Sequence, residues 1–341
     1  MDPLAKSRIG RTALEVTRLG FGGATLGDAR EPLDEDRAAA TIAAAYAAGI
    51  AYFDTAPWYG TGKSEHRFGH VLRTRPRDSF TLSTKVGRIL VRPEDPAGFS
   101  PERWVGGLPF VVQFDYTYAG VMRAYEDSLQ RLGLNRVDAL LIHDLDFGYH
   151  GDEAGVRARF DELDAGGGYR ALRELKERGE IRAIGAGINV TGFIPRFLER
   201  FDLDVFLVAM PYTLLAQDAL DAELPLVQAR GASVVIGAPF ASGILARGPD
   251  DQPTYGYRPA ESPIVERTRR IQEVCARYGV PLGAAALQFP FGHPSVASII
   301  PGPNSPEQVR ANLDWMRLEI PPDLWAELKA EGLLRPDAPT P

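Results

Sequence analysis

Short apolar runs alternate with amphipathic helical segments along almost the whole chain. Eight of these runs have the length and composition of buried β-strands, and each is followed by a segment of helical periodicity. The runs are residues 16–21, 51–54, 80–85, 137–143, 181–187, 205–210, 233–237 and 296–301. Apolar parallel strands must be covered on both faces, and right-handed crossovers close such βα units into a ring. The pattern therefore predicts an α/β fold, a (β/α)8 TIM barrel.

The alternative architecture is an open, doubly wound parallel sheet, which carries a glycine-rich phosphate turn after its first strand. The stretch GFGGATLG at residues 20–27 has the glycines, but it lacks the G-x-G-x-x-G spacing and an opening helix. We therefore favour the barrel, as a single domain over residues 1–341 with a loose proline-rich tail at about 335–341. Gly22 and Gly23 are interpreted first as turn residues and second as ligand contacts.

Two connections are longer than the others. Residues 88–118 follow the third predicted strand, and residues 144–168 follow the fourth. Both lie at the carboxyl ends of strands, where barrels place their chemistry, and connections of this length are more often functional than idle. We expect these two long loops to shape a substrate pocket.

Composition argues against several classes of function. The chain is 45% hydrophobic and 24% charged, as in globular proteins, and its net charge of −7 comes without a basic block. A nucleic-acid partner is therefore not expected. The N-terminal residues lack an apolar signal core, and no apolar run approaches the roughly 20 residues that span a bilayer. We expect a cytoplasmic protein without a membrane partner, and the sequence carries no signal for an oligomeric state.

Cysteine and histidine usage gives no sign of a disulfide or a metal site. The single cysteine, Cys275, recurs at helical spacing with apolar residues and is interpreted as a small buried hydrophobe. His66 and His70 stand four residues apart on a predicted helix, like a zinc-binding pair. The glutamate of the H-E-x-x-H motif is absent and no third ligand is evident, so no metal is predicted.

Four polar residues stand at or just after the ends of consecutive predicted strands: Asp54, Tyr59, Lys85 and His143. Neighbouring strand ends converge in a barrel, so we expect these side chains to meet. A lysine that ends an apolar strand is costly unless it is paired, and Asp54 is its natural counter-ion. An ammonium group beside Tyr59 is expected to lower the tyrosine pKa from about 10 and to make it an acid–base group. His143 is expected to orient a substrate hydroxyl or carbonyl group.

Three segments of the sequence resemble the signatures of the aldo-keto reductase family. They are GIAYFDTAPWYGTGKSE, SLQRLGLNRVDALLIH and SIIPGPNSPEQVRAN, and the resemblance extends over residues 8–318. It implies that Asp54, Tyr59, Lys85 and His143 are the catalytic tetrad. Tyr59 would then donate or accept the proton while hydride passes to or from C4 of a nicotinamide. The resemblance also implies a (β/α)8 barrel that binds NAD(P) across its carboxyl face without a Rossmann domain.

Further segments are similar to a bacterial subgroup that contains D-threo-aldose 1-dehydrogenase (L-fucose dehydrogenase) and pyridoxal 4-dehydrogenase. These segments are YTLLAQDAL, GAPFASGILARG, AALQFPFGHPSVASIIPG and LWAELKAEGLLRPDAPTP. Both kinds of enzyme oxidise a cyclic hemiacetal to a lactone, which implies a small sugar or similar hemiacetal as substrate. Tyr59 would then act as base for the anomeric hydroxyl group, with Trp58, Tyr59 and His143 as substrate contacts. Trp58 is interpreted either as a sugar-facing platform or as a packed loop anchor.

The resemblance also implies a set of cofactor contacts. They are Gly22, Gly23, Asp54, Asn189, Tyr212, Ala238, Pro239, Phe240, Ser242, Gly243, Gly302, Asn304, Gln308 and Asn312. Many relatives carry Ser-Asn after the fifth strand, where this chain has GAGIN and Asn189 is the candidate for the carboxamide contact. Ala209 stands in place of a glutamine, and Gly237 in place of an aromatic residue that stacks on the nicotinamide.

The residues after the eighth strand bear on the choice between NAD and NADP. NADPH-dependent relatives place Lys or Arg against the 2′-phosphate, and the matching positions here are Gly302, Asn304 and Gln308. A phosphate without a cationic partner is poorly compensated, so we expect NAD as the cofactor. Arg310 is the nearby residue that could provide for NADP instead.

Two other functions remain open from the sequence. One is an NADPH-driven aldehyde or ketone reductase, which needs the same four residues. The other is a non-catalytic barrel that binds nucleotide and regulates a partner, as relatives that serve as potassium-channel β-subunits do. The intact set of four residues argues against this regulatory role.

Overall fold

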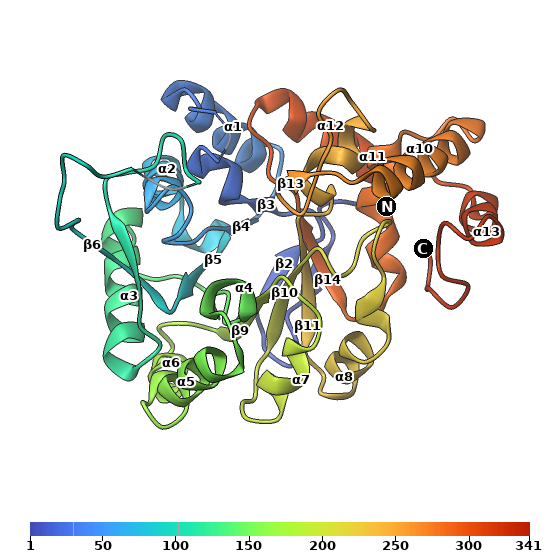
Figure 1. Ribbon diagram of the computed structural model, residues 1–341. Coiled ribbons are helices and arrows are strands. Elements are labelled where there is room, and N and C mark those ends of the chain that lie inside the picture. Colours follow the sequence, from blue (N-terminus) through green and yellow to red (C-terminus); the bar gives the residue numbers. More distant parts are fainter. Residues whose placement is uncertain (30, 101–102) are drawn as a thin grey trace.

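A ring of eight parallel strands forms the centre of the computed structural model, which describes residues 1–29, 31–100 and 103–341 (Figure 1). Sheet neighbours follow chain order, and the ring closes where Gly20 N and Gly22 N donate to Ile299 O and Pro301 O, both at 2.9 Å. The predicted (β/α)8 barrel is confirmed. Its strands are β3 (Phe21–Gly22), β4 (Tyr52–Asp54), β5 (Thr81–Val86), β8 (Ala139–Ile142), β9 (Ala183–Ile188), β10 (Val205–Ala209), β11 (Ser233–Gly237) and β14 (Val296–Ile300).

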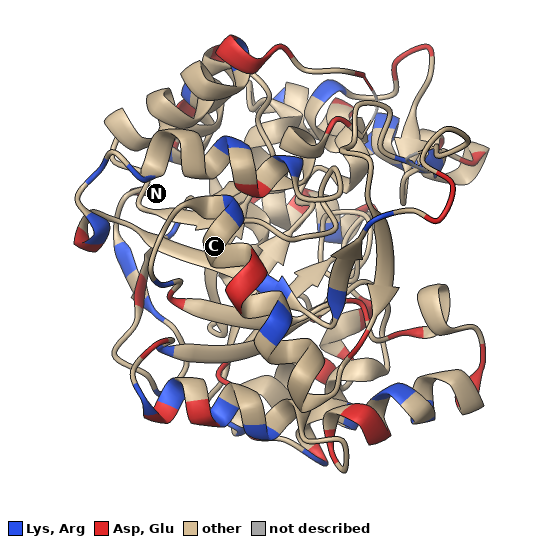
Figure 2. Cartoon of the chain, turned by 90° about the vertical axis from the view of Figure 1, so that its left-hand side faces the viewer, with Lys and Arg blue, Asp and Glu red and all other residues tan. Residues whose placement is uncertain are grey.

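Helices cover the outside of the ring, and their ends follow from local sequence. Helix α3 begins after Thr117, whose hydroxyl accepts from Gly120 N, and it ends at Gly133, which adopts a left-handed conformation (φ 62°). The outer helices are α1 (Glu35–Ala47), α2 (Lys63–Leu72), α3 (Tyr118–Leu132), α6 (Gly168–Glu177), α7 (Phe193–Leu198), α8 (Glu223–Ala229), α9 (Ile244–Arg247), α10 (Ser262–Arg277), α11 (Leu282–Gln288), α12 (Pro306–Arg317) and α13 (Pro322–Ala330). Basic and acidic residues are interspersed along the helices in the view of Figure 2.

The amino end of the barrel is closed by a hairpin that divides the first predicted strand. Residues 16–21 were expected to form one strand, but β1 (Lys6–Arg8) and β2 (Glu15–Thr17) pair antiparallel, and β3 begins only at Phe21. Ile9, Leu14 and Val16 of this segment are buried with the inward-facing side chains of the barrel strands. The carboxyl end is therefore the end at which a ligand can enter.

Three insertions with their own secondary structure stand at the carboxyl end. Residues 88–118, predicted as a loop, contain the antiparallel hairpin β6 (Arg88–Val91) and β7 (Val111–Phe114). Positions 101–102 of this insertion lie outside the described residues. Residues 144–168 contain α4 (Phe147–His150) and α5 (Glu153–Leu163). A third hairpin, β12 (Thr254–Tyr255) with β13 (Arg258–Pro259), was not predicted. Short 3-10 helices complete the chain: η1 (Gly23–Gly27), η2 (Arg77–Ser79), η3 (Asp218–Leu220), η4 (Ala241–Gly243) and η5 (Phe289–Gly292).

The C-terminal segment packs against the body of the protein, contrary to the loose tail expected at about 335–341. Arg335 pairs with Asp221 at 2.6 Å, and Ala338 is fully buried. An apolar residue and an ion pair therefore hold a stretch whose proline content alone indicated disorder. Cys275 is buried as expected, and burial raises the pKa of its thiol to about 12. No helix in the described parts of the chain is long and apolar enough to cross a membrane.

Candidate active site

A buried ion pair lies at the carboxyl ends of β4 and β5. Lys85 Nζ donates to Asp54 Oδ2 and to Thr55 O, both at 2.7 Å, and Ser83 Oγ donates to Asp54 Oδ1 at 2.7 Å. Both charged side chains are about 1% exposed. Burial raises the pKa of Asp54 against the opposing effect of Lys85. The structure thus brings Asp54 and Lys85 together as the sequence predicted, and two of the three N–H groups of the ammonium are engaged.

Tyr59 lies against this pair and is partly exposed. The Lys85 ammonium is 4.8 Å from the centre of the Tyr59 ring. The expected lowering of the tyrosine pKa is wrong, because burial raises the pKa of Tyr59 well above its ordinary value, and Asp54 and Asp144 raise it further. The physical reason is that Asp54 neutralises Lys85, so desolvation of the phenol decides the direction. Tyr59 therefore holds its proton at neutral pH.

His143 completes the group at the end of β8. Its ring centre is 5.8 Å from that of Tyr59, with the ring planes at 87°. Burial lowers the pKa of His143 well below its ordinary value, and the charges of Arg88 and Lys85 add to this effect. His143 Nε2 is 3.2 Å from Asp144 Oδ2, whereas the buried Nδ1 has no hydrogen-bond partner among the described residues. The four predicted residues converge, and the imidazole is neutral.

Trp58 is packed on both sides. Its ring meets that of Trp104 edge to face at 5.5 Å, and the Arg88 guanidinium lies 4.8 Å from its centre. Trp58 is only 6% exposed. Of the two interpretations of Trp58, these contacts favour the packed loop anchor over the sugar-facing platform. Trp104 and Arg88 belong to the insertion after β5, so this insertion lies over the loop that carries Tyr59.

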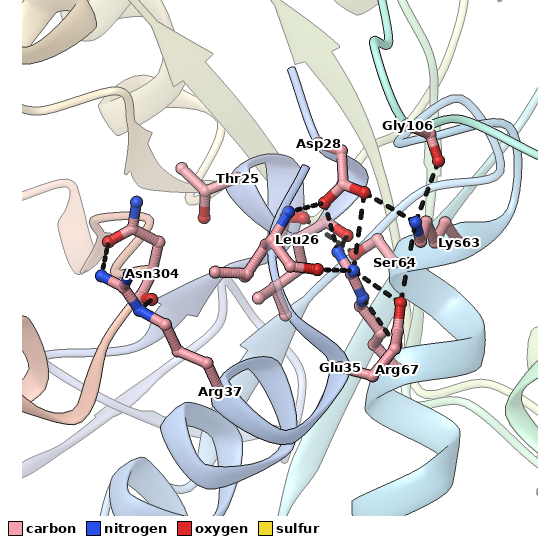
Figure 3. Close-up of polar contacts among 12 residues, drawn as sticks. Thr25, Leu26, Asp28, Glu35, Arg37, Lys63, Ser64, Arg67, Gly106 and Asn304 are labelled. Carbon is pink, nitrogen blue, oxygen red and sulfur yellow. Dashed lines mark hydrogen bonds and ion pairs between the residues drawn. The ribbon is translucent and has the colours of Figure 1, made fainter. Parts of the chain in front are cut away.

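A second buried ion pair fixes the helix that follows Tyr59 (Figure 3). Asp28, fully buried after η1, accepts from Arg67 Nη1 at 2.5 Å and from Lys63 Nζ at 2.7 Å. Arg67 also binds both carboxylate oxygens of Glu35, at 2.7 and 3.0 Å. Lys63 Nζ donates to Gly106 O at 3.0 Å. The first turn of α2 is thereby tied to η1, to α1 and to the insertion after β5.

The turn between Tyr59 and α2 has an unusual backbone. Gly60, Thr61 and Gly62 all have positive φ angles, of 65°, 49° and 101°. A Cβ at Gly60 would lie 2.7 Å from Gly27 O, so only glycine fits at this close approach. Tyr59 is therefore carried by a tight turn that both the second ion pair and neighbouring backbone hold in place.

Two polar neighbours of His143, Arg88 and Asp144, were not predicted from the sequence. Asp144, in a left-handed conformation (φ 47°), accepts from Arg88 Nη2 at 2.6 Å and from Asn189 Nδ2 at 2.6 Å. Asn189 thus lies beside His143, with its amide nitrogen on Asp144. The signal that could have found Asp144 is its place directly after the apolar strand LLIH, since Asp54 ends its own strand in the same way.

Tyr212 does not lie where the predicted cofactor contact requires. It is fully buried in the shell outside the barrel, with its ring centre 5.3 Å from that of Phe289. Tyr212 therefore packs in the core and cannot stack on a ligand at the mouth. The chain turns away because Met210, directly after β10, adopts a positive φ of 79°. Met210 itself is partly exposed.

The segment after β11 has an unusual backbone. Ala238, Ala241, Ser242 and Gly243 have φ angles of 48°, 46°, 67° and 107°. Gly243 begins α9 without a side-chain cap. The N–H groups of Ala241 and Gly243 donate within the segment, to Ala238 O at 2.9 Å and to Phe240 O at 2.8 Å. The cofactor contacts at 238–243 therefore stay a prediction. Pro239 lies within this segment, and Phe240 meets Trp315 edge to face at 5.8 Å.

Close packing explains why three positions of the predicted cofactor set are glycine. A Cβ at Gly22 would lie 2.6 Å from Ile300 O, and one at Gly23 would lie 2.4 Å from the Phe68 ring. At Gly302 it would meet Thr25 at 3.0 Å. The contacts of Gly22 and Gly302 close the barrel next to β3 and β14, and that of Gly23 packs it against α2. These contacts support the interpretation of Gly22 and Gly23 as turn residues.

The residues that follow β14 come after the strand that pairs with β11. They contact one cation that was not predicted from the sequence, Arg37. Asn304 N donates to Gln308 Oε1 at 2.9 Å. Asn304 O accepts from Arg37 Nε at 2.9 Å (Figure 3). The predicted cation, Arg310, instead donates to Glu307 at 2.6 Å. Arg37 comes from α1, so its approach to Asn304 depends on a contact between distant segments. Asn312 is buried on α12.

Metal ligands do not gather in the described parts of the chain. No group of three or more His, Cys, Asp or Glu side chains there is arranged to hold an ion. His66 and His70 both lie on α2. Burial lowers the pKa of His66, and Arg131 adds to this effect.

Comparisons with known proteins agree with the fold and the site described above. Residues 18–331 match the Aldo/keto reductase family. Pyridoxal 4-dehydrogenase of Microbacterium luteolum is 42% identical over 337 residues, covering 96% of this chain and 98% of that protein. D-threo-aldose 1-dehydrogenase of a Pseudomonas species is 38% identical over 337 residues, covering 95% of this chain and 96% of that protein.

A solved structure gives the same result for the fold. The holo form of the aldo-keto reductase AKR11C1 from Bacillus halodurans superposes with a TM-score of 0.76 at 27% identity. The alignment covers 97% of each chain. The subgroup resemblance stated from the sequence is therefore confirmed by two dehydrogenases and by a barrel of the same architecture.

Proposed function

Because the chain belongs to the aldo/keto reductase family of oxidoreductases, we propose that it is an NAD(P)-dependent dehydrogenase that oxidises C1 of an aldose hemiacetal to the lactone. The observation that carries the proposal is the position of Tyr59 against the buried Lys85–Asp54 pair, with His143 facing it. The similarity to two named dehydrogenases supports the oxidative direction.

The proposed reaction moves one proton and one hydride. Nicotinamide, when bound, accepts the hydride that leaves the ring carbon. Tyr59 in its deprotonated form takes the proton of the anomeric hydroxyl group onto its phenolic oxygen and becomes neutral. Lys85, whose ammonium lies 4.8 Å from the centre of that ring, stabilises the phenolate before the transfer. His143 orients the substrate hydroxyl group. Because the pKa of Tyr59 is raised, its basic form is scarce at neutral pH and becomes more abundant in alkali.

We propose NAD+ as the preferred cofactor. The side chains at Gly302, Asn304 and Gln308 carry no charge, and Arg310 is paired with Glu307. Arg37 is the cation closest to Asn304 by its hydrogen bond, and it is the residue through which NADP+ would be accepted.

Pyridoxal is a second candidate substrate, since the pyridoxal 4-dehydrogenase of Microbacterium luteolum is 42% identical to this chain. Pyridoxal also forms a cyclic hemiacetal, so the reacting group is unchanged. An NADPH-driven carbonyl reductase would run the reaction in the opposite direction, and a nucleotide-binding regulator would not catalyse it at all. We further propose a single-domain cytoplasmic enzyme that acts on a small molecule.

An activity matrix tests the proposal. L-fucose, D-arabinose, L-galactose and pyridoxal are each incubated with NAD+ and with NADP+, and the products are analysed for the lactone. Turnover of a sugar to its lactone with NAD+ is expected. No turnover of any substrate refutes the hemiacetal assignment, and a preference above about tenfold for NADPH-driven reduction favours the reductase.

A further inference from the structure

A cavity of about 470 Å³ lies at the amino end of the barrel, opposite the end that carries Tyr59. Its walls include Ser233 and Val296, the first residues of the neighbouring strands β11 and β14, and residues of the β1–β2 hairpin. Apolar side chains of the same hairpin fill the interior of the barrel and separate the cavity from the proposed reaction centre. The proposed oxidation therefore makes no use of this cavity.

Two arginines line the cavity without an acidic partner. The hairpin segment, residues 6–18, carries four cations, of which Lys6 and Arg11 pair with carboxylates at 3.8 and 2.5 Å. The other two, Arg8 and Arg18, line the cavity and are accessible to solvent, Arg8 exposed and Arg18 partly so. Their guanidinium groups form no ion pair or hydrogen bond with the described residues, and no described Asp or Glu lines the cavity. Since the whole chain has a net charge of −7, this positive charge is a local feature.

The remaining walls of the cavity are neutral, and one of them is aromatic. The Arg18 guanidinium lies 5.9 Å from the centre of the Phe291 ring, which lines the same cavity. A guanidinium over a ring keeps its in-plane N–H groups for a ligand. Burial lowers the pKa of His293, another lining residue, so its imidazole is neutral at pH 7. The positive charge of the cavity therefore comes from the two arginines.

This combination suits one class of anion better than others. The planar guanidinium binds phosphate through two parallel hydrogen bonds, and two guanidinium charges balance the roughly two negative charges of a phosphate monoester at neutral pH. A single carboxylate would leave one of the two arginines uncompensated. The volume of about 470 Å³ is that of a small-molecule site and exceeds what a bare phosphate ion fills. The cavity therefore has room for an organic group next to the phosphate.

We propose that the cavity between the β1–β2 hairpin and β14 binds a small organic phosphate. Arg8 and Arg18 hold the phosphate, and Phe291 contacts the organic group. Because Arg8 ends β1 and Arg18 follows β2, the phosphate joins the two strands of the hairpin. The site is separate from the cofactor site, and the inference does not depend on the proposed dehydrogenase function.

The test is calorimetric titration with phenyl phosphate, glucose 6-phosphate and inorganic phosphate, with and without saturating NADH. Arg8→Met combined with Arg18→Met removes both charges and keeps most of each side-chain stem. Arg8→Lys combined with Arg18→Lys keeps the charges but removes the forked geometry. Arg170→Met is the matched control, because Arg170 also lies over an aromatic ring (Tyr118, 4.7 Å) without an ion pair to any described residue, but on α6. Circular dichroism checks that each variant is folded.

The expected result is a loss of phosphate binding in the variants alone. The double Met variant should weaken binding of the organic phosphates by about tenfold or more, the double Lys variant by about threefold, and Arg170→Met by less than about twofold. Inorganic phosphate should bind at least about threefold more weakly than the better organic phosphate, which also shows whether an aromatic or a sugar group is preferred. Bound phosphate should raise the unfolding temperature of wild type but not of the double Met variant.

Several outcomes would overturn the proposal. They are equal affinity of wild type and the double Met variant, no binding at about 10 mM organic phosphate, and inorganic phosphate binding as tightly as both organic phosphates. Displacement of the phosphates by NADH would place them in the cofactor site and would overturn it as well. Because the titration requires no turnover, failure of the dehydrogenase assignment leaves this test intact.

Discussion

Two buried ion pairs flank the loop that carries Tyr59, and they differ in how completely their donors are used. All three guanidinium nitrogens of Arg67 donate hydrogen bonds, to Asp28, to Glu35 and to two backbone carbonyl groups. Lys85 donates to Asp54 and to Thr55 O, and its third N–H has no partner among the residues that the structure describes. The saturated pair holds the scaffold, and the pair with a remaining donor faces the phenol.

This difference in donor use distinguishes a buried charge that stabilises the fold from one that can take part in a reaction. A buried charge with every donor engaged has nothing to offer a ligand, and breaking it mainly costs stability. A buried charge with a free donor can respond to a change of charge next to it, which is what a reaction requires.

The largest effect is expected from Lys85→Met. It removes the free donor beside Tyr59 and leaves Asp54 to bind a proton, which the raised pKa of that carboxyl favours. We expect kcat for sugar oxidation to fall by about a thousandfold or more, with the folded state retained. Steady-state kinetics and circular dichroism check this, and a variant within tenfold of wild type contradicts the role of Lys85.

Arg67→Met should show the opposite pattern. It leaves the buried Asp28 without its main partner, so the free energy of unfolding should fall by about 3 to 5 kcal/mol. Below its unfolding transition, kcat should fall far less than in Lys85→Met. Denaturant unfolding and kinetics at low temperature measure the two quantities. The comparison fails if Arg67→Met keeps its stability while losing activity like Lys85→Met.

The pH dependence of oxidation follows from the raised pKa of Tyr59. Since the basic form of Tyr59 appears only as pH rises toward that pKa, kcat/KM for oxidation should increase throughout about pH 7 to 10 without a plateau. Buffered steady-state assays across this range measure the profile. A plateau already reached near pH 7 would show that another group is the base.

The sequence located the barrel strands after the first and the four site residues, but not the polar residues around them. Asp54, Lys85 and His143 are readable because each ends or directly follows an apolar strand. Arg88 was missed because it lies past Gly87, whose positive φ of 97° turns the chain into an unpredicted hairpin. The pairing of Asp28 with Arg67 joins residues 39 positions apart, which periodicity does not register.

Two further expectations, for Tyr212 and for the C-terminal tail, depend on features that the sequence does not show. Tyr212 entered the cofactor set through the family resemblance, but the positive φ of Met210 sends the chain outward. The tail at about 335–341 was expected to be loose because of its composition. Arg335 nevertheless forms an ion pair with Asp221 on a distant segment. Both errors concern tertiary contacts that no local pattern encodes.

The smallest expected effect concerns Arg37. Arg37→Ala should weaken NADP+ binding by about three- to tenfold and leave NAD+ binding within about twofold, since only the former carries the extra phosphate. Arg310→Ala serves as the control, because its partner is Glu307. Fluorescence titration of both cofactors measures the effect, and equal weakening of both shows that Arg37 does not read the phosphate.

The most direct test of the proposed role of Tyr59 is kcat of Tyr59→Phe, with NAD+ affinity measured on the same sample. Removal of one hydroxyl group leaves the ring and its contact with the ammonium in place. We predict a fall in kcat of about a hundredfold to ten-thousandfold with unchanged NAD+ affinity. A variant that oxidises the sugar at close to the wild-type rate would contradict the assignment of the phenol as the proton-transfer group.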